Sequence, residues 1–285
     1  MTEDTLPPLR DVIAAHGLQA KKSLGQNFLY DLNLTRRIAR AGGPLSGHTI
    51  LEVGPGPGGL TRALLSEGAT QVIAIERDPR CLAALAEISA AWPGHLTVVQ
   101  GDATQVDQAA LVYKGTPVRI VANLPYNVAT MLLVSWLTTP AWPPWWASLT
   151  LMFQREVAER LVATPSTKSY GRLSILTQWR STAKVLFDVH PQAFVPAPKV
   201  TSSVVRIEPR AAPLADAPLS ALERVTAAAF GQRRKMLRAS LRTLSQDALA
   251  ILERAGVNPE ARAEDLTIEQ FCAIARTWSA TTKPG

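Results

Sequence analysis

Short runs of β-branched and other apolar residues alternate along the chain with longer segments rich in Ala and Leu. From Thr49 onward the apolar runs are TILEV, QVIAIE, LTVVQ and VRIVANL, and segments such as TRALLSEG and CLAALAEISA lie between them. Continuous apolar strands are typical of sheets buried on both faces, and parallel neighbours need a crossover helix, which the intervening segments supply. The pattern therefore predicts an α/β domain with a parallel sheet.

The pattern changes towards the end of the chain. Three later runs, SLTLMFQ, AKVLFDV and SSVVRIE, are expected to add strands to the same sheet, some of them antiparallel. After Pro209 the segment PRAAPLADAP is typical of a linker, and residues 220–278 show helical periodicity without a strand-like run. We therefore expect one domain over residues 1–209 and a small all-helical domain over residues 210–285.

Composition and charge narrow the class of protein. The chain has 285 residues, of which 47% are hydrophobic and only two are cysteines, and this composition excludes a disordered chain and a disulfide-stapled one. Its formal net charge of +7 makes an anionic partner such as nucleic acid plausible. The first residues, MTEDTLPPLRD, lack the features of a signal peptide. Residues 120–154 carry no charge, but prolines and asparagines interrupt them well before the roughly 20 residues of a membrane span. We expect a cytoplasmic protein.

A glycine-rich turn follows the first clear strand and leads directly into a helix. Its glycines have the spacing GxGxxG, at Gly54, Gly56 and Gly59, and an acid at the end of the next strand, Glu76, lies 22 positions after the first glycine. This spacing is also that of dinucleotide-binding proteins. However, Pro55 and Pro57 each remove a backbone N–H from the loop that would have to bind a pyrophosphate.

A ligand without phosphates therefore suits the loop better, and S-adenosylmethionine is such a ligand. Glu76 is placed to hold its ribose diol, and Asp102, at the end of the third strand, lies where open α/β sheets bind their ligands. Taken alone, an Asp at a strand end serves equally often as the cap of the next helix. A dehydrogenase is disfavoured because no constellation for hydride transfer accompanies the loop.

The fourth strand ends in a tetrapeptide that carries chemistry, Asn123-Leu124-Pro125-Tyr126. An exocyclic adenine amine is a poor nucleophile because its lone pair is delocalised into the ring. The Asn123 amide oxygen and the Leu124 carbonyl are two acceptors for its N–H groups, and Tyr126 offers a ring to stack on the base. Such a reaction needs positioning and electrostatic alignment but neither a metal nor a nucleophilic residue. The alternative is an ordinary turn capped by Asn.

An ordered set of motifs resembles one known family, the ribosomal RNA adenine dimethyltransferases, and within it the bacterial small-subunit type. The motifs are LGQNFL, LEVGPGPGGLT, AIERDPR, GDA, NLPY, FQREVAERL, YGRLSIL and FVPAPKVTSSVV. The resemblance covers roughly residues 10–245, and its combination of motifs is highly specific. It implies a class I, Rossmann-like methyltransferase fold with a mostly parallel seven-stranded sheet and a helical carboxyl-terminal domain.

The resemblance also implies a reaction and its residues. The reaction is four methyl transfers, two to each of two adjacent adenosines in a hairpin near the 3′ end of small-subunit ribosomal RNA, during subunit assembly. Phe194, in the loop FVPAP, corresponds to the family's clamp on the target base, although a buried core position is the commoner fate of a phenylalanine. The implied contacts of S-adenosylmethionine are Asn27, Leu29, Gly54, Glu76, Asp102 and Asn123.

Basic residues gather in two places. The segment FGQRRKMLRASLR, residues 230–242, has five basic residues and no acid, and on a helix it would place Arg234, Arg238 and Arg242 on one stripe beside an apolar stripe of leucines. From this segment alone, a solvated helix face is as plausible as an RNA contact. The residues that we expect to contact RNA are Arg233, Arg234, Lys235 and Arg238, with Lys21 and Lys22 near the amino terminus.

Three hypotheses remain from the sequence. The first is a ribosomal RNA adenine dimethyltransferase that acts as a monomer on the assembling small subunit. The second is a DNA adenine methyltransferase, although those enzymes commonly carry Pro where Leu124 stands and usually need a larger recognition region than about 70 helical residues. The third is an assembly factor that acts mainly by binding. The segment Trp142–Trp146 has no role that we can assign.

Overall fold

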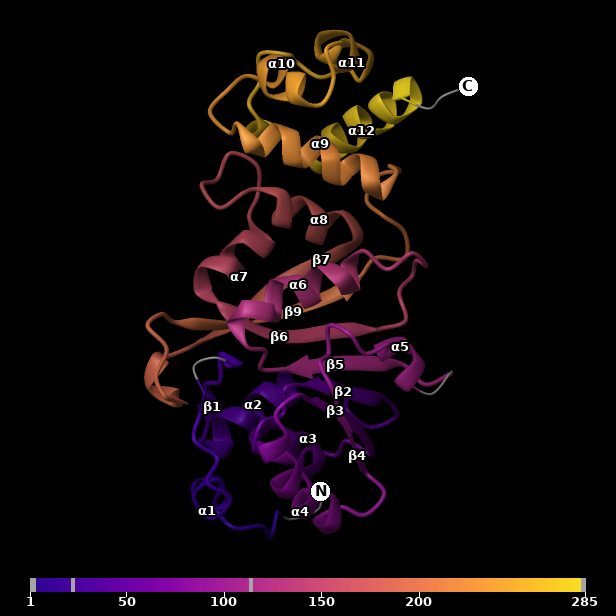
Figure 1. Ribbon diagram of the computed structural model, residues 1–285. Helices are drawn as coiled ribbons and strands as arrows, with labels where there is room; N and C mark the ends of the chain where they lie inside the picture. The colour runs from indigo at the N-terminus through magenta and orange to yellow at the C-terminus, as the bar shows by residue number, and fades with distance from the viewer. Residues whose placement is uncertain (1–3, 22–23, 113–114, 283–285) are drawn as a thin grey trace. The chain divides into compact units, whose positions relative to one another are not determined.

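The computed structural model describes residues 4–21, 24–112 and 115–282. Its centre is a seven-stranded sheet with the order β4-β3-β2-β5-β6-β9-β7 (Figure 1). All pairs from β4 to β6 are parallel, and β9 pairs antiparallel with β6. The expected α/β sheet, mostly parallel and with later antiparallel addition, is confirmed. The strands are β2 (Thr49–Val53), β3 (Gln71–Glu76), β4 (Leu96–Gln100), β5 (Val118–Ala122), β6 (Ser148–Gln154), β7 (Ser181–Val189) and β9 (Ser202–Pro209).

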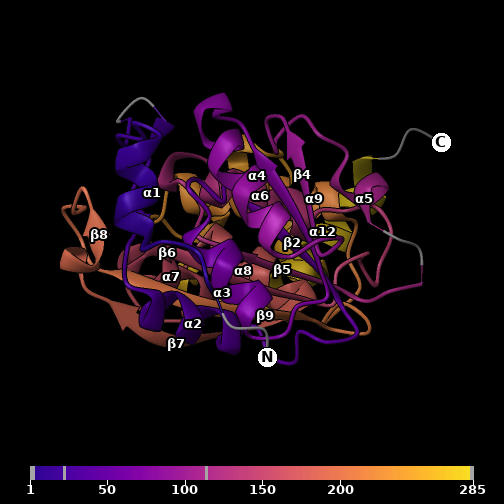
Figure 2. The same ribbon diagram turned by 90° about the horizontal axis from the view of Figure 1, so that it is seen from below.

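Helices connect the parallel strands, as the crossover rule requires. Figure 2 shows α2 and α3 beside each other, and the side chain of Asp31 caps α2 by accepting the N–H of Asn33 at 2.8 Å. None of the helices within the described residues is long and apolar enough to cross a membrane. The helices up to β6 are α1 (Leu9–Ala15), α2 (Leu32–Ala41), α3 (Gly59–Ser66), the short 3₁₀ turn η2 (Pro79–Cys81), α4 (Leu82–Ala91), α5 (Gln108–Leu111) and α6 (Tyr126–Leu137).

A second, two-stranded sheet joins the amino-terminal segment to a distant loop. Strand β1 (Phe28–Leu29) pairs antiparallel with β8 (Phe194–Val195), so that Leu29 lies opposite Phe194. Strand β8 follows the 3₁₀ turn η3 (Pro191–Ala193) in the β7–β9 connection, which is orange in Figure 2 and lies beside the indigo amino-terminal segment. This pairing holds residues 24–29 near the sheet although they are far from it in sequence.

The register of the parallel strands decides where the functional residues meet. Strand β2 pairs with β3 so that Val53 lies opposite Ile75, and β3 pairs with β4 so that Glu76 lies opposite Gln100. On the other side of β2, Leu51 lies opposite Ile120 of β5. The carboxyl ends of all four strands therefore meet at one edge. The chain order reverses at β2, and ligands of open α/β sheets bind at such a switch point.

The chain divides into two compact units. The first comprises residues 1–158 and 184–208, and the second comprises residues 159–183 and 209–285. Residues 159–183, which we expected in the first domain, therefore pack with the helical part. The reason is that Tyr170 and Trp179 are buried in the core of the second unit. There the Tyr170 hydroxyl donates to the Leu266 carbonyl at 2.9 Å, and the indole N–H of Trp179 donates to the Ala215 carbonyl at 2.7 Å.

The second unit has its own apolar core. Phe230 stacks on Phe271 at 5.7 Å between ring centroids and meets Tyr170 edge-on at 6.1 Å. The unit takes in the second half of α7, which spans Arg155–Val162. Its other helices and 3₁₀ turns are α8 (Arg172–Arg180), α9 (Leu219–Gly231), α10 (Leu237–Ser240), η4 (Leu241–Thr243), α11 (Ala248–Arg254), η5 (Ala263–Asp265) and α12 (Ile268–Thr282).

The expected continuous helix over residues 230–242 is wrong. Helix α9 ends at Gly231, residues 232–235 form a turn, and Met236 has extended backbone and bridges to Arg262. The Leu237 N–H donates to the Ala261 carbonyl, so the backbone bonds that a helix would form here go to another segment. Arg234 therefore does not share a helical stripe with Arg238, although Leu237 is buried as the apolar stripe predicts.

Candidate active site

A pocket opens at the carboxyl edge of the sheet, at the switch point beside β2. Five segments, all from the first unit, supply most of its lining: residues 24–29, 52–57, 76–78, 101–104 and 123–128. Four of them directly follow strands or form their last residues, and the fifth is the segment that β8 holds in place. The expected ligand-binding edge is thus a concave site.

The glycine loop brings its backbone close to the pocket. Gly54 has a φ of +70°, in the left-handed region that favours glycine, and its N–H donates to the Ile75 carbonyl at 2.9 Å. Gly58 has a φ of +88°, and a Cβ there would lie 2.1 Å from the Cδ1 of Ile88. A side chain would strain the backbone at either position because of the positive φ, and at Gly58 it would also require the Ile88 side chain to move.

Glu76 ends β3 with its carboxylate engaged by two backbone amides. One oxygen accepts the N–H of Gly56 at 2.8 Å and the other accepts the N–H of Asp78 at 2.7 Å. Burial raises the pKa of Glu76, and these two hydrogen bonds oppose the rise. The carboxylate therefore holds the glycine loop against the β3 end while it lines the pocket.

Asp102 follows β4 and does two things at once. Its Oδ1 accepts the N–H and the hydroxyl of Thr104 at 2.9 and 2.7 Å, and its Oδ2 lies 3.2 Å from Arg77. The hydrogen bonds from Thr104 lower the pKa of Asp102, with a further contribution from Arg77, so the group is ionised at neutral pH. It stabilises its own turn but does not cap the next helix, α5, whose N-cap is Asp107, and it also lines the pocket.

Asn123 follows β5 and its carboxamide is oriented by the amino-terminal segment. Its Nδ2 donates to the Asn27 carbonyl at 3.3 Å, across 96 residues of sequence. With the nitrogen committed to the protein, the carboxamide oxygen is the acceptor that Asn123 contributes at this edge. Tyr126 begins α6 and its hydroxyl shares a hydrogen bond with the Ser202 hydroxyl, which restrains the ring. Burial raises the pKa of Tyr126.

The structure brings together nearly all of the residues that the sequence predicted for catalysis and cofactor binding. Phe194 is the exception: it is only 2% exposed, belongs to the core and is absent from the pocket lining. The pairing of β8 with β1 buries the ring, so its predicted place at the target base is not supported by this structure. The predicted residues that do line the pocket are Asn27, Leu29, Gly54, Glu76, Asp102, Asn123, Leu124 and Tyr126.

The predicted RNA-binding residues differ in their surroundings. Arg234 and Lys235 are exposed in the turn after α9, and Arg238 is exposed at the start of α10, 3.6 Å from Glu260. The guanidinium of Arg233 instead holds Glu264 at 2.7 Å and donates to the Thr167 carbonyl, which gives it a structural role in the second unit. Lys21 is exposed, and Lys22 lies outside the described residues.

Sequence reasoning assigned no role to three polar residues of the pocket. Glu52 and Asp78 line it from β2 and from the turn after β3, and Gln26 lines it from the amino-terminal segment. Glu52 lies in an apolar strand and Asp78 lies in a polar turn, and neither sequence pattern indicates that the acid is buried. Their positions beside the glycine loop and Glu76 were the available signal.

Comparison with known proteins gives the class of enzyme. A family model described as "Ribosomal RNA adenine dimethylase" matches residues 17–279. The chain is 64% identical over 276 residues, 97% of its length and 95% of the relative's, to a Xanthobacter autotrophicus protein named "Ribosomal RNA small subunit methyltransferase A". A Mesorhizobium japonicum protein of the same name is 63% identical over 278 residues, 96% of this chain and 99% of that one. The chain belongs to the ribosomal RNA adenine dimethylase family.

Solved structures of similar fold agree with that membership. A dimethyladenosine transferase from Plasmodium falciparum has a TM-score of 0.75 at 24% identity, with 89% of this chain and 98% of that one covered, and it supports the fold. The 23S rRNA methyltransferase ErmE has a TM-score of 0.64 at 28% identity, with 89% of this chain and 100% of that one covered. The expected methyltransferase fold and enzyme class of this adenine dimethylase family member are confirmed.

Glu52, the second residue of the motif LEVGPGPGGLT, is a buried carboxylic acid that forms no ion pair with any cation among the described residues. Its side chain is 1% exposed, and the Thr61 hydroxyl donates to its Oε2 at 2.6 Å. Burial is the largest influence on Glu52 and raises its pKa from 4.5 to about 8. At neutral pH the folded protein therefore keeps this group protonated, whereas the unfolded chain ionises it.

This difference predicts a dependence of stability on pH. Between about pH 4.5 and about pH 8 the unfolded state binds fewer protons at Glu52 than the folded state, so the free energy of unfolding falls as the pH rises. Glu52→Gln should remove this part of the fall and be more stable than the wild type at pH 9, by on the order of 2–4 kcal/mol. Urea unfolding from pH 5 to pH 9 measures both. Glu208→Gln, a change at an exposed glutamate, should show the same dependence of the free energy of unfolding on pH as the wild type. If the free energy of unfolding of Glu52→Gln fell with pH in parallel with that of the wild type, the raised pKa of Glu52 would be contradicted.

Proposed function

We propose that this protein uses S-adenosylmethionine to dimethylate the exocyclic amines of two adjacent adenosines in a hairpin near the 3′ end of 16S ribosomal RNA, during assembly of the small subunit. The name shared by relatives that are 63–64% identical over nearly the whole chain supports the substrate. The observation that carries the proposal is the Asn123 carboxamide, which Asn27 orients at the edge of the pocket. We expect the protein to act as a monomer in the cytoplasm.

The chemistry of the pocket fits S-adenosylmethionine, which presents a ribose diol, amines and a cationic sulfur. The polar groups that line the pocket include three acceptors suited to these donors and this charge, namely the carboxylates of Glu76 and Asp102 and the oxygen of Asn123. Prolines at positions 55 and 57 leave the loop poor in the amide donors that a pyrophosphate needs. We assign the cofactor to Asn27, Leu29, Gly54, Glu76, Asp102 and Asn123.

When bound, S-adenosylmethionine supplies the methyl group as an electrophile on a positively charged sulfur. The residues Asn123 and Leu124 act on the adenine. In the first transfer the Asn123 oxygen and the Leu124 carbonyl accept the two N–H groups of the exocyclic amine, and in the second transfer one of them accepts the single N–H that remains, which localises the lone pair on nitrogen and directs it. After each transfer the nitrogen carries a positive charge and releases a proton, so no buried general base is required. Most of the acceleration comes from fixed acceptors and orientation.

Tyr126 and the basic surface serve the RNA. The Tyr126 ring, restrained through Ser202, offers a face on which an unstacked adenine can stack. Arg234, Lys235 and Arg238 are exposed cations placed for phosphates, and recognition by shape and backbone is typical of folded RNA. We propose that Lys21 and Lys22, near the amino terminus, also contact RNA phosphates.

The variant Asn123→Ala tests the proposed chemistry. Because it removes one of two acceptors for the amine, methyl transfer should fall by roughly 10²- to 10³-fold. Labelled S-adenosylmethionine is offered to undermethylated small subunits, to naked small-subunit RNA and to duplex DNA. We expect label in the adenosines of the subunits with the wild type, almost none with Asn123→Ala, and unchanged subunit binding by both.

Asn33→Ala, at an exposed position on α2, is the matched control and should transfer methyl groups at the wild-type rate. Label in duplex DNA would overturn the assignment in favour of a DNA adenine methyltransferase. Full transfer by Asn123→Ala would show that its oxygen is not the acceptor.

The double variant Arg234→Glu/Arg238→Glu tests the RNA surface. Subunit affinity should fall, and the slope of log affinity against log salt should become shallower by about 1–2, because each lost phosphate contact releases about one counterion fewer. Filter binding at several salt concentrations measures both. Arg10→Glu/Arg254→Glu makes the same change of charge at two other exposed arginines and should keep the salt slope. Equal behaviour of the two double variants would remove the turn after α9 from the RNA surface.

A further inference from the structure

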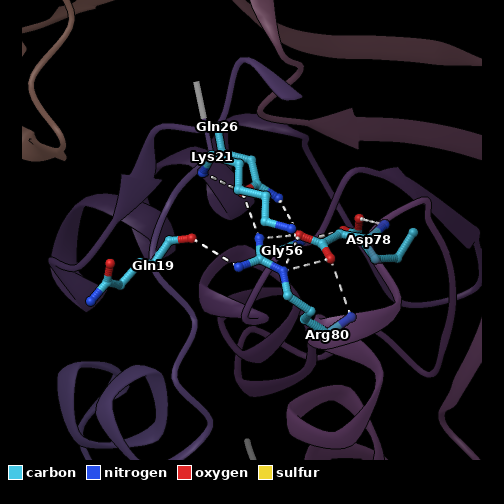
Figure 3. Close-up of polar contacts among 7 residues, drawn as sticks. Gln19, Lys21, Gln26, Gly56, Asp78 and Arg80 are labelled. Atoms are coloured by element: carbon cyan, nitrogen blue, oxygen red, sulfur yellow. Dashed lines mark hydrogen bonds and ion pairs between the residues drawn. The ribbon is translucent and has the colours of Figure 1, made fainter. Parts of the chain in front are cut away.

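A buried carboxylate lines the pocket beside the amino-terminal segment. Asp78 is 3% exposed, and its carboxylate accepts the side-chain amide of Gln26 at 2.9 Å (Figure 3). It also pairs with Arg80, whose Nε lies 3.0 Å from Oδ1 and 3.2 Å from Oδ2. The reaction proposed above uses none of these three residues.

Gln26 belongs to a segment that is itself one wall of the pocket. Every residue of the wall segment, residues 24–29, lines the pocket, and the Asn27 carbonyl orients Asn123. Strand pairing with β8 holds the far end of the wall segment, at Phe28 and Leu29. At the near end the Gln26 side chain is the polar anchor: its Nε2 reaches Asp78 and its Oε1 accepts the N–H of Lys21 at 2.9 Å.

Arg80 extends the same anchor to the chain before the wall segment. Its Nη1 donates to the Gln19 carbonyl at 3.2 Å, and its Nη2 lies 3.4 Å from the Gln26 Oε1 (Figure 3). Arg80 is the first influence that lowers the pKa of Asp78, to about 2, so this carboxylate is ionised at every physiological pH. Its hydrogen bond to Gln26 is therefore charge-assisted, and such bonds are roughly twice as strong as neutral ones.

Hydrogen bonds also connect Asp78 to the groups proposed to bind the cofactor. The backbone N–H of Asp78 donates to one oxygen of Glu76, whose other oxygen accepts the N–H of Gly56. A continuous chain of hydrogen bonds thus runs from Gln26 through Asp78 and Glu76 to the glycine loop. Displacement of Asp78 would move the wall segment and the Glu76 carboxylate together.

We propose that Asp78 is a positioning residue that holds the wall segment closed against the cofactor pocket, with Gln26 as its contact on that segment and Arg80 as its counter-ion. This inference rests on the proposed binding of S-adenosylmethionine in the pocket. It assigns to Asp78 retention of the cofactor and not the transfer step, because none of its atoms is required at the reacting amine.

The test uses Asp78→Asn and Gln26→Ala in the full chain. Each variant removes the charge-assisted bond, so the dissociation constants of S-adenosylmethionine and S-adenosylhomocysteine, measured by calorimetry, should rise about tenfold or more. The KM for S-adenosylmethionine should rise similarly, while kcat on small subunits at saturating cofactor should fall far less than with Asn123→Ala, because the bound cofactor holds the wall segment, and with it Asn27, in place. Hydrogen exchange of the amides of residues 24–29 should be faster in both variants without any ligand.

A double variant and a control separate this role from a general loss of stability. Gln26→Ala/Asp78→Asn should lose less binding free energy than the sum of the two single losses, because both substitutions break the shared Gln26–Asp78 bond, although each also affects a contact of its own. Glu208→Gln makes the same kind of change at the exposed ion pair with Arg206 and should leave every value unchanged. Should Asp78→Asn fail to fold, Gln26→Ala alone still decides the matter.

The outcomes are distinguishable from failure of the proposed function. A wild type that binds neither ligand overturns the proposed cofactor, and this inference falls with it. A wild type that binds both ligands, with Gln26→Ala and Asp78→Asn binding equally well and exchanging equally slowly, overturns only the role of Asp78. A fall in kcat without a change in dissociation constant would also contradict it.

Discussion

The parallel register of β3, β2 and β5 is the constraint on which the rest of the site depends. Because these strands run in the same direction and end at the same level, Gly54, Glu76 and Asn123 meet at one edge although they span 70 residues of sequence. The wall segment is held at the same edge by its pairing with β8, by the burial of Phe28 and Leu29 in the core, and by its hydrogen bonds to Asn123 and Asp78. The family's motifs are thus separate in sequence because they are the ends of successive strands.

Three carboxylic acids close to this edge show how surroundings divide their roles. Glu52 has a single hydroxyl partner and a raised pKa, Glu76 accepts two backbone amides, and Asp78 is paired with Arg80 and has a lowered pKa. The first is a protonated packing group at neutral pH, the second links the glycine loop to β3, and the third is a permanent charge that anchors a pocket wall. Residue type alone separates none of them, because only the partners differ.

The sequence predicted the features that depend on local pattern. Buried strands read as continuous apolar runs, and the residues that follow them fall at the carboxyl edge by the geometry of parallel sheets, so Gly54, Glu76 and Asn123 could be placed in advance. Features that depend on distant contacts could not. Residues 159–183 join the helical unit through Tyr170 and Trp179, and the helix expected over 230–242 breaks because its backbone bonds to residues 261 and 259 instead. Likewise β8 buries the ring of Phe194, and nothing in its own loop indicates that pairing.

The central claim is that the Asn123 carboxamide directs an adenine amine towards a methyl donor held at the carboxyl edge. The most direct measurement is a crystal structure of the protein with S-adenosylhomocysteine. The account predicts the ribose hydroxyls at the Glu76 carboxylate, the adenine beside Asp102 and the sulfur facing the Asn123 oxygen. A ligand bound elsewhere on the protein, or bound at this edge with its sulfur turned away from Asn123, would contradict the account.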